Sequence, residues 1–324
     1  MIYLSRKRPH KLEVSEVLIK RAVYDDKERE LLEDIILKSS IGYEGECFVD
    51  KYWSDLRLSF PHALLHGFET THRQHFHHQI DTVMICPHFI LITELKYIAG
   101  ELFYDESLNQ LWRIHNGQHL ALGDPFAQVS RHEMWLTQFL WEIGIDVPII
   151  TAVVVTAKSA LLRQMPKQFH VFKLDGLGLK LKGWLQKYPE VLDSGQVEQI
   201  ALELLKHHRV QKWSWKEVFS GLRIKNGVLC GCGLTMRYEL GTFLCSCGKS
   251  SRKGIYEALN DYRIIESEWI SNRAFRKYLG ISSPDTAYKI LKKVSCEEKG
   301  QNKGRKYRLS EEILREKRGD TDKF

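Results

Sequence analysis

The chain has 324 residues, which is enough for two or three domains and for at least one well-buried core. Hydrophobic residues make up 43% of it and charged residues 27%, as in an ordinary soluble globular protein. No apolar run approaches the roughly 20 residues needed to cross a bilayer, and no apolar segment follows the basic first residues as it would in a secretory signal. We therefore expect a cytoplasmic protein without a membrane partner.

Positive charge is concentrated in the last third of the chain. The net charge of +7 arises from 48 basic and 41 acidic residues. Residues 221–324 hold 22 Lys and Arg against 13 Asp and Glu, a net of +9, so that residues 1–220 carry a net of −2. A tail of this charge indicates a polyanion partner such as nucleic acid, although solubility alone would explain it equally well.

The first part of the chain passes from helical to strand patterns. Apolar residues recur at helical spacing in residues 12–38 and 43–53, which Ser39, Ser40 and Gly42 separate. The pattern then changes to that of successive strands. These predicted strands are residues 63–68, 80–85, 89–97 and 101–104.

A helix is predicted to begin after these strands and to run to about residue 143. Asp124 suits its N-cap, and Pro125 suits the first helical position. The β-branched run at residues 148–156 is typical of a strand covered on both faces. Residues 177–215 are predicted to be largely helical, so a mixed α/β domain with a central sheet flanked by helices is the economical assembly.

The most informative spacing joins three charged residues of two predicted strands. Twelve residues separate Asp81 from Glu94, and Lys96 follows two residues later within the apolar run FILITELKYI. Because residues two apart on a strand share a face, Glu94 and Lys96 project together, and a hairpin can bring Asp81 beside Glu94. Two converging carboxylates suit Mg²⁺ or Mn²⁺, and the lysine can orient an attacking water or stabilise a phosphorane. An exposed Glu–Lys pair on an edge strand is the alternative.

Two further polar residues lie where they could complete such a site. Glu46, in the stretch GYEGE at residues 42–46, stands near the start of the second predicted helix and could add a carboxylate to the same metal. Gln128 lies one turn into the helix after the sheet, where its amide could hold the water or a phosphate oxygen. Taken singly, each could be an ordinary solvated side chain.

Four short motifs in this order resemble the nuclease-related domain (NERD) family. They are Gly42-Tyr43-x-Gly45-Glu46, Ile80-Asp81, Glu94-x-Lys96 and Pro125-x-x-Gln128. The resemblance covers roughly residues 35–160, and the family is placed in the PD-(D/E)xK nuclease superfamily, so it implies a restriction-endonuclease-like fold. It implies that Asp81 and Glu94 bind the metal, that Lys96 serves catalysis, and that Glu46 and Gln128 complete the site. The helix before the first motif is similar to the N-terminal extension of Gram-positive bacterial members.

Seven histidines cluster before and within the predicted sheet. HxxH and HxH spacings among them would allow a histidine metal site. Residues 70–79 are predicted to form a loop between two strands, and a hydrated loop that gains charge as the pH falls explains the cluster more simply. The histidines are His62, His66, His72, His75, His77, His78 and His88.

Four of the seven cysteines form two close pairs. Cys230 and Cys232 are separated from Cys245 and Cys247 by twelve residues, which contain a predicted turn at residues 239–242. In a chain without a signal peptide, paired cysteines more often bind metal than form disulfides. Two such pairs joined by a hairpin follow the plan of a zinc ribbon with a structural Zn²⁺, although C-x-C is tighter than the usual C-x-x-C. Four reduced cysteines in a small hairpin are the alternative.

Three helices and a charged hairpin are predicted after the cysteines. The helices are residues 253–261, 271–279 and 284–294. Ser271 and Ser283 suit N-caps, Gly280 ends the second helix, and residues 298–309 form the hairpin. The order resembles the winged helix-turn-helix fold, although a helical protein–protein module fits it too. The residues expected to contact nucleic acid are Lys289, Lys292, Lys293, Lys303, Arg305 and Lys306.

The sequence as a whole predicts four contiguous domains and a metal-dependent nuclease. The domains are an N-terminal helical extension (1–40), a nuclease-like domain (41–220), a zinc-ribbon-like module (221–253) and a winged-helix-like DNA-binding module (254–324). The expected reaction is hydrolysis of phosphodiester bonds in nucleic acid, DNA in the first place, with Mg²⁺ or Mn²⁺ and water as the nucleophile. The alternative is a non-catalytic DNA-binding or adaptor protein that keeps the nuclease fold. A homodimer is compatible with the sequence, which identifies no protein partner.

Overall fold

The computed structural model describes residues 1–72 and 76–319 and divides the chain into two units. Unit 1 comprises residues 1–9 and 38–212, and unit 2 comprises residues 10–37 and the chain from residue 213 onward. The predicted domains were contiguous, whereas each unit combines two separate segments. This happens because the first strand joins the main sheet of unit 1, while the helix after it packs within unit 2.

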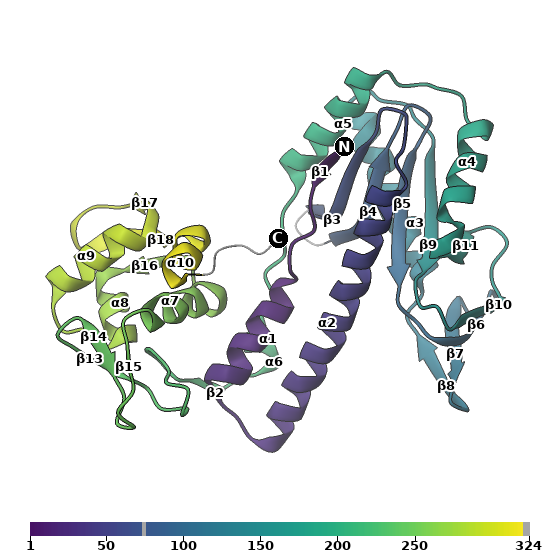
Figure 1. Ribbon diagram of the computed structural model, residues 1–324. Coiled ribbons are helices and arrows are strands. Elements are labelled where there is room, and N and C mark those ends of the chain that lie inside the picture. The colour runs from purple at the N-terminus through teal and green to yellow at the C-terminus, as the bar shows by residue number, and fades with distance from the viewer. Residues whose placement is uncertain (73–75, 320–324) are drawn as a thin grey trace. The chain divides into compact units, whose positions relative to one another are not determined.

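Unit 1 is built around a six-stranded mixed sheet (Figure 1). Its strands, in sheet order, are β1 (Ile2–Leu4), β3 (Ala63–His72), β4 (Phe76–Ile85), β5 (Ile90–Lys96), β9 (Ile149–Val155) and β11 (His170–Lys173). β3, β4 and β5 are antiparallel neighbours, whereas β1 is parallel to β3, and β9 and β11 continue parallel to β5. The predicted mixed sheet flanked by helices is confirmed.

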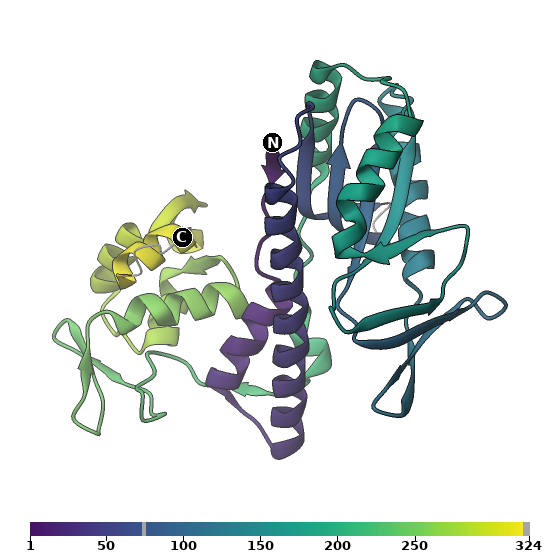
Figure 2. The same cartoon turned by 45° about the vertical axis from the view of Figure 1, so that its right-hand side comes forward.

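Helices cover both faces of this sheet (Figures 1 and 2). They are α2 (Asp26–Asp55), α3 (Pro125–Glu142), α4 (Leu177–Lys187), which follows the 3-10 turn η1 (Leu174–Gly176), and α5 (Ser194–His207). Leu65 and Ile92 pack with α3 and α5 on one face, and Leu64 and Leu91 pack with α2 and α4 on the other. Neighbouring residues thus face opposite layers, as the two-residue period of a strand requires.

A second, four-stranded sheet extends unit 1. Its strands, in sheet order, are β10 (Ala160–Gln164), β6 (Gly100–Asp105), β7 (Gln110–His115) and β8 (Gln118–Leu122). β6, β7 and β8 form an antiparallel meander, and β10 pairs parallel with β6. Tyr104 and Leu111 on one face of this sheet are buried against Phe126 at the start of α3. That contact joins the second sheet to the helix that carries Gln128.

Unit 2 has a hydrophobic core of its own, to which Phe275, Leu291 and Tyr307 belong. Its elements up to the cysteine hairpin are α1 (His10–Arg21), β2 (Ala22–Val23), the first part of α2, α6 (Trp215–Val218), β12 (Arg223–Ile224), β13 (Arg237–Glu239), β14 (Thr242–Leu244) and β15 (Ser250–Ser251). The later ones are α7 (Gly254–Ile265), β16 (Trp269–Ser271), α8 (Asn272–Leu279), α9 (Pro284–Val294), β17 (Ser295–Lys299), the 3-10 turn η2 (Asn302–Gly304), β18 (Lys306–Leu309) and α10 (Glu311–Arg318).

The predicted caps of the C-terminal helices are confirmed. Ser271 accepts a hydrogen bond from the backbone N–H of Ala274, and Ser283 accepts one from that of Thr286. Gly280 ends α8 with φ of 68°, in the left-handed region that glycine adopts without strain. Local sequence chemistry therefore sets these boundaries.

The prediction of two helices separated by Ser39, Ser40 and Gly42 is wrong. The first predicted helix ends early, at Arg21, and α2 then runs for 30 residues without a break. Helix-breaking residues cost only about 1 kcal/mol each in a helix interior, and burial of apolar residues such as Val49 on the same helix outweighs that cost.

No helix in the described chain is long and apolar enough to cross a membrane.

The predicted loop at residues 70–79 is also wrong. β3 continues to His72 and β4 starts at Phe76, with Thr70 paired to His78 across the hairpin. Both of these side chains are buried, whereas Thr71 and Gln79 are exposed, as the alternation of a strand requires. Residues 73–75, which include His75 of the predicted cluster, lie outside the described residues.

Candidate active site and cysteine cluster

Asp81 and Glu94 lie on the adjacent antiparallel strands β4 and β5. Thr82 pairs with Thr93 across the two strands. Asp81 and Glu94 are the next residues beyond this pair in the same direction, so they lie side by side. The backbone N–H of Leu95 donates to Oδ2 of Asp81 at 2.7 Å. Asp81 is 7% exposed and Glu94 only 3%, so both carboxyl groups are largely removed from water. The structure thus brings together the two predicted metal ligands.

β3 and β4 change their alternation where Asp81 lies. Leu65 and Phe68 on β3 both face the layer of α3 and α5, as do the residues paired with them on β4. Residues three apart on a regular strand face opposite sides of the sheet. Each of the two strands therefore contains one irregularity between these residues, where the alternation of its side chains is reversed. Gly67 has φ of 64° at this place on β3, a conformation that favours glycine. The irregularity lets the carboxylate of Asp81 turn towards the backbone of β5.

Glu94, Lys96 and Gln128 form a closed set of hydrogen bonds. Lys96 Nζ donates to Glu94 Oε1 at 2.6 Å, and Gln128 Nε2 donates to Glu94 Oε2 at 2.9 Å. Lys96 Nζ also reaches Gln128 Oε1 at 3.4 Å. Asp124 caps α3 by accepting from the backbone N–H of Phe126, as predicted, which fixes the first turn that carries Gln128. The three predicted residues therefore meet at one end of the sheet.

Burial and mutual repulsion make these carboxyl groups reluctant to ionise. Burial, together with the charge of Asp81, raises the pKa of Glu94 to about 8. Burial also raises the pKa of Asp81. Burial, together with the charge of Asp81, raises the pKa of Glu46 to about 7. A divalent cation would relieve this repulsion, so the donor set fits Mg²⁺ or Mn²⁺ chemically.

The three carboxylates do not form a closed metal cage. Among the described residues, only the four cysteines bring three or more ligand atoms within 4.8 Å of one another. Asp81 and Glu94 would therefore hold an ion with few protein oxygens. Mg²⁺ tolerates this well, since it usually keeps several of its waters and takes one or two carboxylates.

Glu46 is held by an arginine that sequence reasoning missed. Arg6, 4% exposed at its side chain, donates from Nη1 to Glu46 Oε2 at 2.7 Å. It also donates to both carboxylate oxygens of Asp50, at 2.9 and 3.1 Å, and to the backbone oxygen of Asp81 at 2.6 Å. The guanidinium thus joins three acidic residues from two elements and supplies a fixed positive charge beside the candidate metal site.

His66 extends this network. Its Nδ1 lies 3.1 Å from Asp50 Oδ1 and 3.2 Å from the hydroxyl oxygen of Thr82. Arg6 and Asp50 gave no signal in the sequence, and His66 was noted only as a member of the histidine cluster. Arg6 stands in a basic stretch that resembles a solvated surface, and it enters the interior only because β1 pairs with β3 beside Leu64.

Gly45 lies where α2 passes the end of β5. A Cβ at this position would lie 3.6 Å from the side chain of Tyr97, the residue after β5. A Cβ there would make an ordinary van der Waals contact with Tyr97, so the helix passes close to the end of β5. This close approach places Glu46, the next residue, beside the acidic site.

The described histidines do not assemble into a metal site. His78 and His132 are both buried, and their Nδ1 atoms lie 3.1 Å apart. Burial, followed by repulsion from His78, lowers the pKa of His132 to about 4. This pair is therefore an interior contact that opposes protonation. The side chain of His72 lies outside the described part of the chain.

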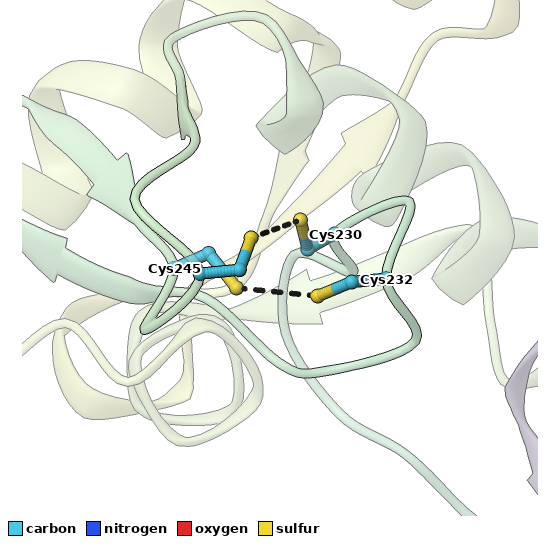
Figure 3. A group of neighbouring side chains, drawn as sticks. Cys230, Cys232 and Cys245 are labelled. Carbon is cyan, nitrogen blue, oxygen red and sulfur yellow. Dashed lines mark hydrogen bonds between the residues drawn. The ribbon is translucent and has the colours of Figure 1, made fainter.

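The four paired cysteines come together in unit 2 (Figure 3). Cys230 Sγ lies 3.6 Å from Cys247 Sγ, and Cys232 Sγ lies 3.5 Å from Cys245 Sγ. Four thiolates at the usual Zn–S distance of about 2.3 Å stand about 3.8 Å apart in a tetrahedron, so the observed spacing fits Zn²⁺. A hydrogen bond from the backbone N–H of Lys249 lowers the pKa of Cys247 to about 7, whereas, despite a hydrogen bond from the backbone N–H of Cys247, burial and the neighbouring thiols raise the pKa of Cys245.

The predicted nucleic-acid residues of unit 2 lie on α9 and on the β17–β18 hairpin. Lys289, Lys292, Lys293 and Lys306 are exposed and Arg305 is half-buried, whereas the side chain of Lys303 lies outside the described part of the chain. Glu298 on β17 forms ion pairs with Lys292 and, at 3.9 Å, with Arg305. Part of the positive charge is thus already balanced within the unit.

Comparison with known proteins identifies one domain. Residues 41–156 match the sequence model of the family described as the nuclease-related domain. The chain contains a nuclease-related domain. This domain includes Glu46, Asp81, Glu94, Lys96 and Gln128, and it confirms the resemblance predicted from the sequence.

The nuclease-related domain does not account for the whole site or the whole chain. Arg6 lies before its first residue, and the four cysteines lie after its last. No curated protein and no solved structure matches the chain. The contribution of Arg6 and of unit 2 must therefore be argued from geometry.

Proposed function

We propose that the nuclease-related domain hydrolyses phosphodiester bonds in nucleic acid with the help of Mg²⁺ or Mn²⁺. The observation that carries this proposal is the meeting of two buried carboxylates, Asp81 and Glu94, with Lys96 and Gln128 inside the matched segment. Burying charged side chains costs free energy unless other charges or hydrogen bonds compensate them. A buried site of this composition, next to an interior arginine, is therefore better explained by a function than by a contribution to stability.

The residues of the site would divide the work. Asp81 and Glu94 would hold the cation, and Glu46 would add negative charge beside them. The bound Mg²⁺ or Mn²⁺ would polarise a phosphoryl oxygen and make a bound water more acidic. Lys96, already within 2.6 Å of Glu94, would orient the attacking water and offset the charge that grows on phosphorus. Gln128 would fix Glu94 and hold the water or a phosphate oxygen.

For unit 2 we propose a structural Zn²⁺ bound by Cys230, Cys232, Cys245 and Cys247. Four thiolates fill all the positions of a tetrahedral zinc ion, which leaves none for substrate. The turn at Leu240 and Gly241, both with positive φ, joins β13 to β14 and supports the predicted hairpin between the two cysteine pairs.

We further propose that α7 to β18 form a winged helix that binds DNA. The order helix, strand, helix, helix and two paired strands, with β18 lying between β16 and β17, supports this. α9, with Lys289, Lys292 and Lys293, would enter the major groove. The hairpin with Lys303, Arg305 and Lys306 would contact phosphate. DNA as the substrate and a cytoplasmic location belong to the same proposal.

One observation favours a second candidate, a non-catalytic DNA-binding or adaptor protein. Arg6 forms an ion pair with Glu46, so the negative charge of this third carboxylate is already balanced within the chain. A protein that keeps the nuclease fold but no longer binds the metal could keep this ion pair.

Cleavage assays separate the two candidates. The purified full chain is incubated with supercoiled, linear and single-stranded DNA and with RNA, in Mg²⁺ or Mn²⁺, beside a Lys96→Ala variant. The nuclease proposal expects cleavage that requires the metal and is lost in Lys96→Ala. Binding of DNA without cleavage would establish the adaptor, and cleavage that survives in Lys96→Ala would indicate a contaminating enzyme.

A further inference from the structure

The outward face of the second sheet carries a row of stacked rings. This sheet lies at the lower right of unit 1 in Figure 1. The rings of Phe103 on β6 and Trp112 on β7 are stacked, with centroids 4.5 Å apart and planes at 14°. Trp112 in turn stacks on His119 of β8, at 5.4 Å and 14°. Because β8 is the edge strand, His119 ends the row at the open side of the sheet.

The opposite face of the same strands is already satisfied. Leu102, Tyr104 and Leu111 alternate with the ring residues and are buried in the body of unit 1. An antiparallel sheet with one buried face normally presents polar side chains on the other. Here that other face carries the rings of Phe103, Trp112 and His119 among polar residues, with His119 exposed and the other two half-buried. Burial in the core does not explain these rings.

A hollow lies beside the row of rings. Its volume is about 310 Å³, and Trp112, His119 and Gln110 line it together with Asp105, Leu108, Leu120 and Ala121. A volume of this order is within the range of small-molecule sites. The hollow offers ring faces and aliphatic side chains on its walls and an amide, that of Gln110, for hydrogen bonding.

Of two acidic residues on this face, Glu101 is paired with a cation, whereas Asp105 is held by hydrogen bonds from uncharged groups. Arg163 of β10 donates to Glu101 at 2.8 Å. Asp105 accepts hydrogen bonds from the backbone N–H groups of Ser107 and Leu108. Asp105 keeps its negative charge, so this face is a weak site for phosphate, which seeks clustered cations, and its rings suit a flat, uncharged partner.

We propose that this face, formed by Phe103, Trp112 and His119 beside the hollow, binds an unpaired nucleobase of the nucleic acid on which the neighbouring site acts. The proposal rests on the proposed function, because it takes nucleic acid as the polymer. A base that stacks on an aromatic side chain gains affinity whatever its identity, since every base has a flat face. A paired base is already stacked within its duplex, so this face selects single-stranded or locally opened nucleic acid.

The sheet that carries the rings belongs to the same domain as the proposed catalytic site. β6, β7 and β8 lie entirely within the segment that matches the nuclease-related domain. Their buried face packs on Phe126 at the start of α3, and the hydroxyl of Tyr104 lies 3.4 Å from Asp124, the cap of that helix. Lys96 and Leu111 line the same apolar wall. The ring face is thus built on the far side of the strands that support Gln128 and Lys96.

Binding without cleavage provides the test. Fluorescence anisotropy of the full chain, in buffer that lacks Mg²⁺ and Mn²⁺ but contains no chelator that would remove the proposed Zn²⁺, compares a labelled single-stranded oligonucleotide with a duplex of the same sequence. Trp112→Leu should weaken single-strand binding about tenfold, as expected for the loss of one stacked base, and leave duplex binding unchanged. Trp112→Phe should retain most of the affinity. Trp141→Leu is the matched control, because Trp141 is 80% exposed on α3 and lies outside this face.

Two measurements on the unaltered protein guard against a variant that fails to fold. A single strand with abasic positions should bind about tenfold more weakly than the intact strand. An iodouracil-labelled strand should crosslink under light to a peptide that contains Trp112 or His119. Equal affinity for abasic and intact strands, or crosslinks only to other peptides, overturns the proposal.

The remaining outcomes separate this proposal from the proposed function. Single-strand binding that depends on Trp112 in a chain that never cleaves upholds the ring face and rejects hydrolysis. Cleavage with no effect of Trp112→Leu on single-strand affinity does the reverse. If Trp112→Leu converts a dimer to a monomer in sedimentation and leaves base binding unchanged, the face is a contact between copies and the proposal is wrong.

Discussion

The carboxylate site of unit 1 and the cysteine cluster of unit 2 are both candidate metal sites, but they prepare for a cation in different ways. The cysteines come from one short stretch, and their sulfur atoms already stand at metal-binding spacing. The carboxylates come from β4, β5 and α2, and they are balanced by Lys96 and Arg6. A site that holds its ion permanently needs no other partner for its ligands. A site whose ion exchanges must keep the fold intact when the ion is absent, and positively charged side chains can balance its ligands in that state.

The largest effect is expected from removing a zinc ligand. Cys245→Ser should abolish tight zinc binding, since a four-thiolate zinc site contributes on the order of 10 kcal/mol or more to folding. Metal analysis should fall from about one zinc per chain to none, and the near-ultraviolet circular dichroism of unit 2 should weaken. Cys296→Ser, at an exposed cysteine outside the cluster, is the control. If Cys245→Ser keeps its zinc, the cluster is not the site.

Arg6→Met tests the internal cation of unit 1. The substitution leaves Glu46 and Asp50 without their partner, and breaking a buried ion pair costs about 3–5 kcal/mol. Urea unfolding should show this loss, whereas Lys7→Met, at an exposed neighbour, should be neutral. Mg²⁺ should restore more stability to Arg6→Met than to the unaltered chain. If Mg²⁺ stabilises both equally, Arg6 does not share the field of the metal site.

Glu94→Gln separates charge from shape at the centre of the site. The amide fills the same volume and can still accept from Lys96, so the melting temperature should stay the same or rise. Cleavage should fall about 100- to 1000-fold, as when one electrostatic group is removed from an active site. Glu44→Gln, at an exposed glutamate of the same motif, should cleave normally. Full activity in Glu94→Gln would exclude Glu94 as a metal ligand.

The smallest effect concerns pH. The pKa of His132 is lowered to about 4 by burial and by His78, against an ordinary value of 6.5. The unfolded chain therefore binds this proton first, so the contribution of neutral His132 to stability is complete above pH 6.5 and is lost as the pH falls towards 4. The loss is at most about 3.5 kcal/mol, at about 1.4 kcal/mol for each unit of the pKa difference. In urea titrations at several pH values, His132→Asn should flatten this dependence, and His115→Asn, at an exposed histidine, should not.

Sequence reasoning succeeded where the determinants are local. The caps Asp124, Ser271 and Ser283, the strand pattern around Glu94 and Lys96, and the cysteine pairs all depend on residues within a few positions of one another. Such patterns follow from helix capping, strand period and ligand spacing, which need no knowledge of the rest of the chain.

It failed where distant contacts decide. Arg6 belongs to the site only because β1 pairs with β3, and nothing near Arg6 in the chain encodes that pairing. The break predicted at Gly42 was overruled by packing along α2, and the strand extension to His72 by pairing with β4. The ring face was missed for the same reason, since Phe103, Trp112 and His119 become neighbours only across three strands.

The pairing of β1 with β3 also bears on how this domain can be moved between proteins. A gene fragment cut at the limits of the family match, residues 41–156, would encode the acidic residues but omit Arg6, β11, α4 and α5. Such a fragment would remove one helix from each face of the sheet and leave Glu46 and Asp50 unbalanced. A graft or truncation that is meant to keep the chemistry should therefore carry the first nine residues and continue to residue 212, the bounds of unit 1.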